Sequence, residues 1–268
     1  MPRYDLAAMT RRAMPGMRKR SIVLRDIDPP GTLATNLFRA VYNPVVQAWA
    51  AGAERIIAAY SATVSEMTTD APADVRAEID GAAEQINRLV LLLTPEVRDW
   101  ALRTEQWYRV KWRGAVLSAT GVDLETMIGA GDVRASLETS IEWNVALVKD
   151  VSDVTRQKIS NAVFDGLRNR TPAREVASTI RDSVGMSRKR ATRIASDQLN
   201  KLTSALAEER RREAGIDTWI SGHSRKAHPR LNHQARDGNE YTDETAPQDL
   251  PGRLLMCCRS QAVVTFDD

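Results

Sequence analysis

The sequence has few of the residues that mark membrane, secreted or disulfide-stabilised proteins. Its 268 residues include two cysteines and three histidines, and aromatic residues make up 5% of the chain. The two cysteines are adjacent and cannot form a disulfide framework, which fits a reducing compartment. No stretch approaches the roughly 20 apolar residues that cross a bilayer, and no apolar segment of the signal-peptide kind follows the basic N-terminus. We expect a protein made in the cytoplasm that has no membrane partner.

The composition is otherwise ordinary, with 43% hydrophobic and 27% charged residues, and the length allows one large or two modest domains. The net charge of +3 is unevenly spread. Residues 1–30 contain seven Lys and Arg against three Asp (+4), and residues 188–212 contain eight basic against three acidic residues (+5). Such segments can neutralise phosphates. The simpler interpretation is a solvated arm and a solvated helix face. The DNA-binding candidates are Arg188, Lys189, Arg190 and Arg193.

Most of the chain predicts helices. Residues 1–33 alternate charges with Met and Pro, and they predict a basic irregular arm that ends in Pro29-Pro30-Gly31. Residues 34–185 predict a helical region, because apolar residues recur there at helical spacing. The predicted helices cover about 35–67, 79–93, 94–116 and 145–169, with a looser connection over 121–132.

Glycine, proline and serine suggest where these helices end. Pro44 and Gly52 should kink or divide the first long helix. A short helix should begin at Thr171-Pro172 and stop at Gly185, and Ser187 should cap the next, long helix. Gly215 occupies the position expected just after that long helix ends.

In the last part of the chain, residues 186–268, the helical pattern gives way to short apolar runs around a polar stretch. After the long helix, Ile216–Ile220 and Ala262–Phe266 are short β-branched and aromatic runs that predict strands. If they pair, they bring together the ends of the polar stretch between them, so that His233 and Cys258 become neighbours. The predicted fold class is a mainly α, bundle-like N-terminal region followed by a small α+β C-terminal module with a short β-sheet.

All the histidines and cysteines lie in this polar stretch, so a metal site must be considered. A structural zinc ion needs four N or S ligands in tetrahedral geometry. The histidines are five residues apart, and the adjacent Cys257 and Cys258 point in different directions. One cysteine and two histidines, with Asp237 or water, could converge. Nevertheless the sequence predicts no bound metal and no cofactor, with His233 and Cys258 as the residual metal candidates.

Catalytic interpretations are also open. Cys258 could be a nucleophile beside His233 or Arg259, but the run that follows it resembles a buried strand. His228 and His233 followed by Asp237 faintly suggest a His-Asn-His nuclease, although prolines interrupt the helix that such a site needs. We therefore predict that the chain is not an enzyme. A metal-dependent nuclease or hydrolase at this tail is the alternative.

The favoured interpretation is a structural polar network. The guanidinium groups of Arg230 and Arg259 can bind carbonyls or carboxylates, and His233 can join two loops through its ring nitrogens. Asp237-Gly238 is a turn signal. Such a network would hold a loop-rich module together without chemistry.

Several ordered elements of residues 186–266 resemble the C-terminal domain of the Mu F-like phage head morphogenesis family, the minor head (minor capsid) proteins of tailed phages. The elements are the helix Arg190–Ala205, then Ala214-Gly215-Ile216, Trp219, Arg230, His233, Asp237-Gly238, Pro251 and Cys258-Arg259 before a hydrophobic strand. Where the family tends to end in Cys-Arg-Cys, this chain has Cys258-Arg259-Ser260.

The resemblance implies a structural protein of the virion, made in the host cytoplasm and incorporated in few copies near the portal vertex. Its partners would be the portal protein, the major capsid or scaffold protein and sometimes packaged double-stranded DNA. The motif residues carried over are Arg230, His233, Asp237, Gly238, Cys258 and Arg259, in an architectural role. The alternative to this function is a DNA-binding protein that uses its basic arm and helix.

Overall fold

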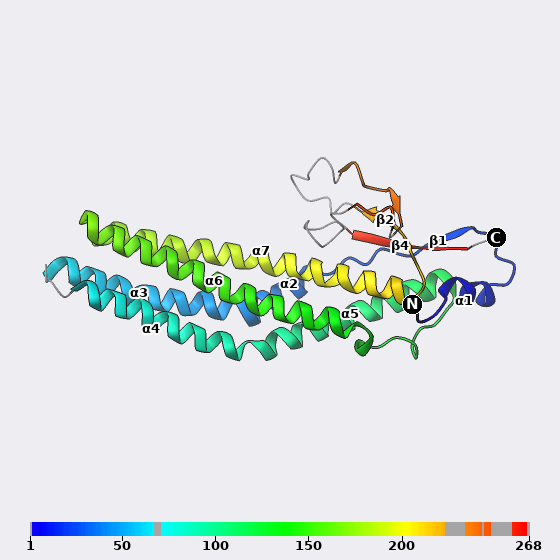
Figure 1. Ribbon diagram of the computed structural model, residues 1–268, viewed down its shortest axis with the longest axis horizontal. Helices are drawn as coiled ribbons and strands as arrows, with labels where there is room; N and C mark the ends of the chain where they lie inside the picture. The colour runs from blue at the N-terminus through cyan, green and yellow to red at the C-terminus, as the bar shows by residue number, and fades with distance from the viewer. Residues whose placement is uncertain (1, 67–70, 223–233, 243, 248–258, 267–268) are drawn as a thin grey trace. The chain divides into compact units, whose positions relative to one another are not determined.

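The computed structural model describes residues 2–66, 71–222, 234–242, 244–247 and 259–266 (Figure 1). The helices are α1 (Leu6–Ala13), α2 (Gly31–Leu37), the π-helix η1 (Phe38–Tyr42), α3 (Asn43–Glu66), α4 (Ala71–Leu92), α5 (Thr94–Thr120), the 3-10 helix η2 (Ala130–Val133), α6 (Arg134–Asn169) and α7 (Ala173–Glu213). The strands are β1 (Ser21–Val23), β2 (Thr218–Gly222), β3 (Glu240–Tyr241) and β4 (Arg259–Thr265). The predicted fold class, mainly α with a small sheet near the C-terminus, is confirmed.

The chain divides into two compact units that are each assembled from separate segments. The first unit contains residues 1–33, 101–140 and 197–268, and the second contains residues 34–100 and 141–196. The predicted boundary after residue 33 coincides with a boundary between the units, whereas the predicted boundary after residue 185 does not. The helices α5, α6 and α7 each contribute to both units. None of the helices in the described part of the chain combines the length and hydrophobicity that a membrane span requires.

Polar side chains link the helices of the second unit inside its core. The indole Nε1 of Trp49 on α3 donates to the hydroxyl of Ser152 on α6 at 3.0 Å. The Thr155 hydroxyl on α6 lies 2.6 Å from the Ser187 hydroxyl on α7. Trp49 is 1% exposed, so these hydrogen bonds form away from water. They fix the register of α6 against both neighbouring helices.

The predicted helix break at Gly185 is wrong. Gly185 lies inside the single helix α7, and Ser187 is buried in that helix and donates to the Ser183 carbonyl instead of capping a new one. A glycine in a helix costs only about 1 kcal/mol relative to alanine. Ile180 and Ala191, both 0% exposed, pack the helix on either side of it and outweigh that cost.

The predicted break near Pro44 takes a milder form. Residues 38–42 form a π-helical turn immediately before α3, and the helix then continues through Gly52. A Cβ at Gly52 would lie 3.0 Å from the Cβ of Ala82 on α4, so glycine permits close approach of the two helices. This glycine serves packing and does not divide the helix.

The prediction of an irregular N-terminal arm is wrong for residues 6–13 and 21–23, which form α1 and β1. Asp5 caps α1 by accepting from the Ala8 amide at 2.9 Å. The amides of Arg3 and Tyr4 donate to the Glu213 carbonyl at the end of α7. The last carbonyls of a helix lack hydrogen-bond donors within it, so the N-terminal segment supplies donors to the C-terminal end of α7.

The sheet has the strand order β1-β4-β2-β3 with antiparallel pairs. The two predicted strands and their pairing are confirmed, because β2 pairs with β4 and places Trp219 opposite Ala262. Gly215, with φ of 69°, reverses the chain between α7 and β2, as its position predicted. The strand β1 was not predicted; it pairs along the other side of β4 (Figure 1).

Candidate functional site

The sheet buries the aromatic residue of the predicted tail motif. Trp219 on β2 is 2% exposed, and its ring centre lies 5.1 Å from that of Tyr241, the opposite residue on β3. The Arg211 guanidinium of α7 lies 5.6 Å from the centre of the Trp219 ring. Trp219 therefore joins the sheet to the end of α7.

Asp237 and Gly238 form the turn that the sequence predicts, and this turn is attached to the sheet. Gly238 has φ of 79°, a conformation that favours glycine. Its amide donates to the Ser221 carbonyl at 2.8 Å, and the Ser221 amide donates to the Asn239 carbonyl at 2.8 Å. These two bonds hold the turn against β2, and the architectural role of Gly238 stays a prediction that this geometry fits.

Most other motif residues lie outside the described residues. This is the case for His228, Arg230, His233, Cys257 and Cys258, so the proximity of His233 to Cys258 stays a prediction. Arg259 is described by its backbone as the first residue of β4, opposite Gly222 of β2. Among the residues that the structure does describe, no group of three His, Cys, Asp or Glu side chains could hold a metal ion.

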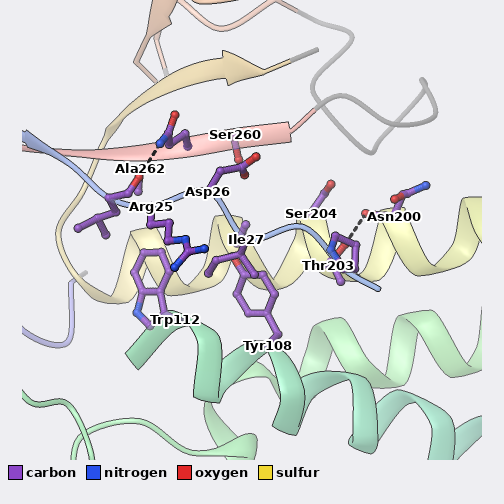
Figure 2. Close-up of a pocket in the computed structure, with 14 residues that line it drawn as sticks. Arg25, Asp26, Ile27, Tyr108, Trp112, Asn200, Thr203, Ser204, Ser260 and Ala262 are labelled. Carbon is purple, nitrogen blue, oxygen red and sulfur yellow. Dashed lines mark hydrogen bonds between the residues drawn. The ribbon is translucent and has the colours of Figure 1, made fainter. Parts of the chain in front are cut away.

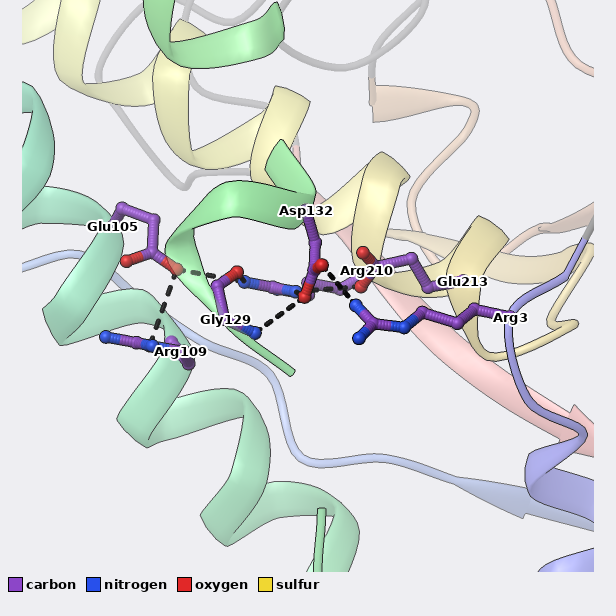
Figure 3. Close-up of polar contacts among 7 residues, drawn as sticks. All are labelled: Arg3, Glu105, Arg109, Gly129, Asp132, Arg210 and Glu213. Atoms are coloured by element: carbon purple, nitrogen blue, oxygen red, sulfur yellow. Dashed lines mark hydrogen bonds and ion pairs between the residues drawn. The ribbon is translucent and has the colours of Figure 1, made fainter. Parts of the chain in front are cut away.

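A buried arginine lies at the centre of the first unit (Figure 3). Arg210 on α7 is 0% exposed, and its guanidinium contacts Glu105 of α5 and Glu213 at 2.9 and 2.8 Å. It also donates to the Gly129 carbonyl at 2.8 Å and lies 3.6 Å from Asp132. One side chain thus connects α5, α7 and the segment around η2.

Two further arginines complete this cluster. Arg109 lies 3.5 Å from Glu105, and Arg3 forms an ion pair with Asp132 (Figure 3). Burial by itself would raise the pKa of Asp132, but the hydrogen bond from the Gly129 amide and the Arg3 guanidinium outweigh it and lower the pKa. We define the Arg210 cluster as the three cations and three carboxylates Arg3, Arg109, Arg210, Glu105, Asp132 and Glu213. Because each group has an opposite charge beside it, the arrangement fits a structural role.

The burial of Arg210 and Glu105 was not predicted, although the sequence contains a signal for it. The apolar stripe of α7 runs through Leu199, Leu202 and Leu206, and Arg210 follows Leu206 by four residues on that stripe. Glu105 likewise follows Ala101 by four residues on the buried face of α5. Arg210 on α7 and Glu105 on α5 are opposite charges that each occupy a position on the buried face of its helix. Such a pattern indicates a buried ion pair.

A small cavity lies between β4, the segment after β1 and the helices α5 and α7 (Figure 2). Its volume is about 30 Å³. A buried water needs roughly 10–15 Å³ of such space and several polar partners. Its lining includes the polar residues Asn200, Thr203, Ser204, Ser260 and Gln261. The cavity can take one or two waters and is far below the roughly 300 Å³ of a small-molecule site.

The four predicted DNA-binding residues all lie exposed on α7 in the second unit, but they differ in their contacts. Arg190 pairs with Asp150 at 2.7 Å, and Arg188 donates to the Asn43 side chain at 3.2 Å. Lys189 and Arg193 have no carboxylate partner among the residues that the structure describes. These two lie four apart, on neighbouring turns of one face.

Comparison with known proteins finds a partial match to a curated protein. No model of a protein family matches the chain, and no solved structure matches it. The chain is similar to an uncharacterized protein of Haemophilus influenzae, with 29% identity over 141 residues that make up 52% of this chain. It spans about a third of that relative's length, since the match covers 32% of it. Activity and partners of the chain are therefore matters for proposal.

Proposed function

We propose that this chain is a structural minor head protein of a tailed bacteriophage that takes part in prohead assembly near the portal. Its partners would be the portal protein and the major capsid or scaffold protein, and its location the phage head. The observation that carries the proposal is the ordered motif of residues 186–266, framed by the pairing of β2 with β4.

The geometry of the first unit is consistent with a structural role. The Arg210 cluster consists of opposite charges that contact each other at the junction of α5, α7 and η2. Its groups are engaged in holding segments together. The turn at Gly238 is likewise held by backbone hydrogen bonds to β2.

Incorporation into particles tests the proposal. Proheads assembled with and without this chain are purified, and its copies are counted against portal protein by quantitative mass spectrometry. We expect a few copies per particle that remain after washing in high salt. A chain that stays wholly outside the particles contradicts the proposal.

Two glycine variants show whether the tail module is required. Gly238→Val places a β-branched residue at a positive φ and should disturb the turn on β2, lowering incorporation. Gly81→Ala on α4 is the matched control, because a Cβ there meets no heavy atom within 4 Å. If both variants fold and are incorporated equally, the tail module is not required for assembly.

A second function, binding of duplex DNA, is favoured by the exposed cations Lys189 and Arg193 on α7. A minor head protein that lines the DNA path would have both functions. Phosphate binding predicts that log affinity falls with log salt by about 0.9 for each phosphate neutralised. Binding that is undetectable or independent of salt contradicts this second function.

A further inference from the structure

The edge strand β1 is a distinctive surface of the first unit. β1 has β4 as its neighbour on one side and ends the sheet on the other. The Leu24 amide donates to the Ala262 carbonyl and the Phe266 amide donates to the Arg20 carbonyl, both at 2.9 Å. The segment Arg20–Leu24 therefore runs along β4 beyond the three residues of the strand itself.

The register fixes which backbone groups point outward. In an antiparallel pair, residues alternate between those bonded to the neighbour and those facing away. Since Arg20 and Leu24 bond to β4, Ile22 does so as well, while the N–H and C=O groups of Ser21 and Val23 point away from it. Four backbone groups thus have no backbone partner among the residues that the structure describes.

The side chains of this edge divide in the same way. Ile22 and Leu24 are 9% and 1% exposed and belong to the core. Ser21 is exposed, and Val23 is a large apolar residue that is 46% exposed. An approaching strand would meet open backbone and an apolar side chain.

Four cations flank the edge, and none of them has a carboxylate partner among the described residues. They are Arg18, Lys19, Arg20 and Arg25, all exposed. Other arginines of the first unit, such as Arg113 and Arg212, do lie beside carboxylates. Residues 18–25 contain these four cations and no acidic residue, so the edge itself is positively charged, and Asp26 and Asp28 follow beyond its end.

We propose that β1 is a docking site for an extended acidic segment of a partner protein, which adds a strand to the sheet. Strand addition takes its affinity from main-chain hydrogen bonds and its specificity from side chains. The four cations attract Asp and Glu on the incoming strand, and they repel the β1 edge of a second copy of this chain. The inference does not depend on the proposed role in the phage head.

The binding test uses the full-length protein and a synthetic peptide of sequence Asp-Val-Glu-Val-Asp-Val-Glu. Its matched control replaces every Asp with Asn and every Glu with Gln. We expect saturable binding of the acidic peptide, measured up to about 1 mM so that weak affinity is detected. Binding of the neutral peptide should be at least about tenfold weaker. Equal binding of both peptides, or of neither, overturns the proposal.

Amide hydrogen exchange locates the peptide. The amides of Ser21 and Val23 should exchange rapidly in the free protein and slow by at least about tenfold with saturating peptide. The amides of Ile22 and Leu24 already bond to β4 and should change little. Protection elsewhere, with Ser21 and Val23 unaffected, overturns the assignment of this edge.

Variants distinguish the contribution of backbone hydrogen bonds to peptide binding from that of charge. Val23→Pro removes an outward N–H without touching a bond to β4 and should abolish peptide binding. Lys19→Glu with Arg20→Glu should weaken it at least about tenfold. The same reversal at Lys189 and Arg193 on α7 is the control and should leave binding unchanged. If Val23→Pro fails to fold, the charge variants and the exchange data still decide.

A duplex DNA fragment serves as the competing polyanion. If DNA binds at residues 18–25 while the acidic peptide does not, the edge is a phosphate site and the proposal of a protein partner is wrong. If peptide binding persists in the Lys19→Glu, Arg20→Glu variant at full affinity, charge does not select the partner, and the proposal is wrong in that respect too.

Discussion

Arg210 and Glu105 form a buried ion pair with a closest nitrogen–oxygen distance of 2.9 Å, and their side chains are 0% and 2% exposed. The pair joins the C-terminal part of α7 to α5 within one compact unit. Two charges buried at such a site stabilise the fold only while each has its partner. The stability of the first unit should therefore depend strongly on this contact.

Arg210→Met should lower the free energy of unfolding by about 3–5 kcal/mol, because it leaves Glu105 buried without its closest cation. Urea titration followed by tryptophan fluorescence measures the change. Arg212→Met is the matched control on the same helix. The Arg212 side chain is 52% exposed beside Glu208 and Glu209, so its loss should cost less than about 1 kcal/mol. Equal costs would contradict the structural importance of burial at Arg210.

Two helical glycines should respond in opposite directions to alanine. A Cβ at Gly166 would lie 2.7 Å from both the Tyr60 hydroxyl and a Val176 methyl, and Tyr60 is held by its hydrogen bond to the Thr171 carbonyl. Gly166→Ala should therefore destabilise the protein by about 1–3 kcal/mol. Gly185→Ala meets no heavy atom within 4 Å and should stabilise it by about 0.5–1 kcal/mol. Thermal unfolding of both variants checks the signs, and a shared sign would contradict this packing.

These glycines also show what local sequence can predict. Gly215 follows the last turn of α7 and takes the positive φ that its position predicts, because the signal and the structure are both local. Gly185 looks the same in sequence but lies within a helix that tertiary packing maintains. Hydrophobic periodicity, which shows that a segment is helical, can be read from the local sequence. Where one helix ends and the next begins depends on tertiary contacts, which cannot.

The sheet shows the same limit. The β-branched runs around Trp219 and Val263 predict β2 and β4, and these two strands pair with each other. β1 is a three-residue strand surrounded by charges, and its partner β4 lies more than 230 residues away in the sequence, as the pair Ser21–Thr265 shows. No local pattern marks a strand that is formed by a distant neighbour.

Tyr4 should make stability depend on pH in the alkaline range. Burial raises the pKa of Tyr4 from 10.0 to about 12. Below pH 10 the residue is neutral in both states and its stabilising effect is complete. Between pH 10 and 12 the unfolded chain ionises first, so the folded state loses about 3 kcal/mol relative to it. Unfolding free energies measured from pH 9 to 12 should fall less steeply for Tyr4→Phe than for the wild type, and parallel slopes would contradict the effect.

Lys189 and Arg193 of α7, which are exposed and have no carboxylate partner among the described residues, should carry DNA binding if the chain has it. Lys189→Ala with Arg193→Ala should reduce the salt slope of binding by about 1.8, which corresponds to two phosphate contacts. Arg181→Ala with Arg190→Ala is the matched control, because it removes the same charge from the same helix. Arg181 and Arg190 are paired with Glu54 and Asp150, so their loss should change the slope little. Titration of a labelled duplex at several salt concentrations measures both slopes. Equal reductions would show that net charge, and not this pair of residues, governs binding.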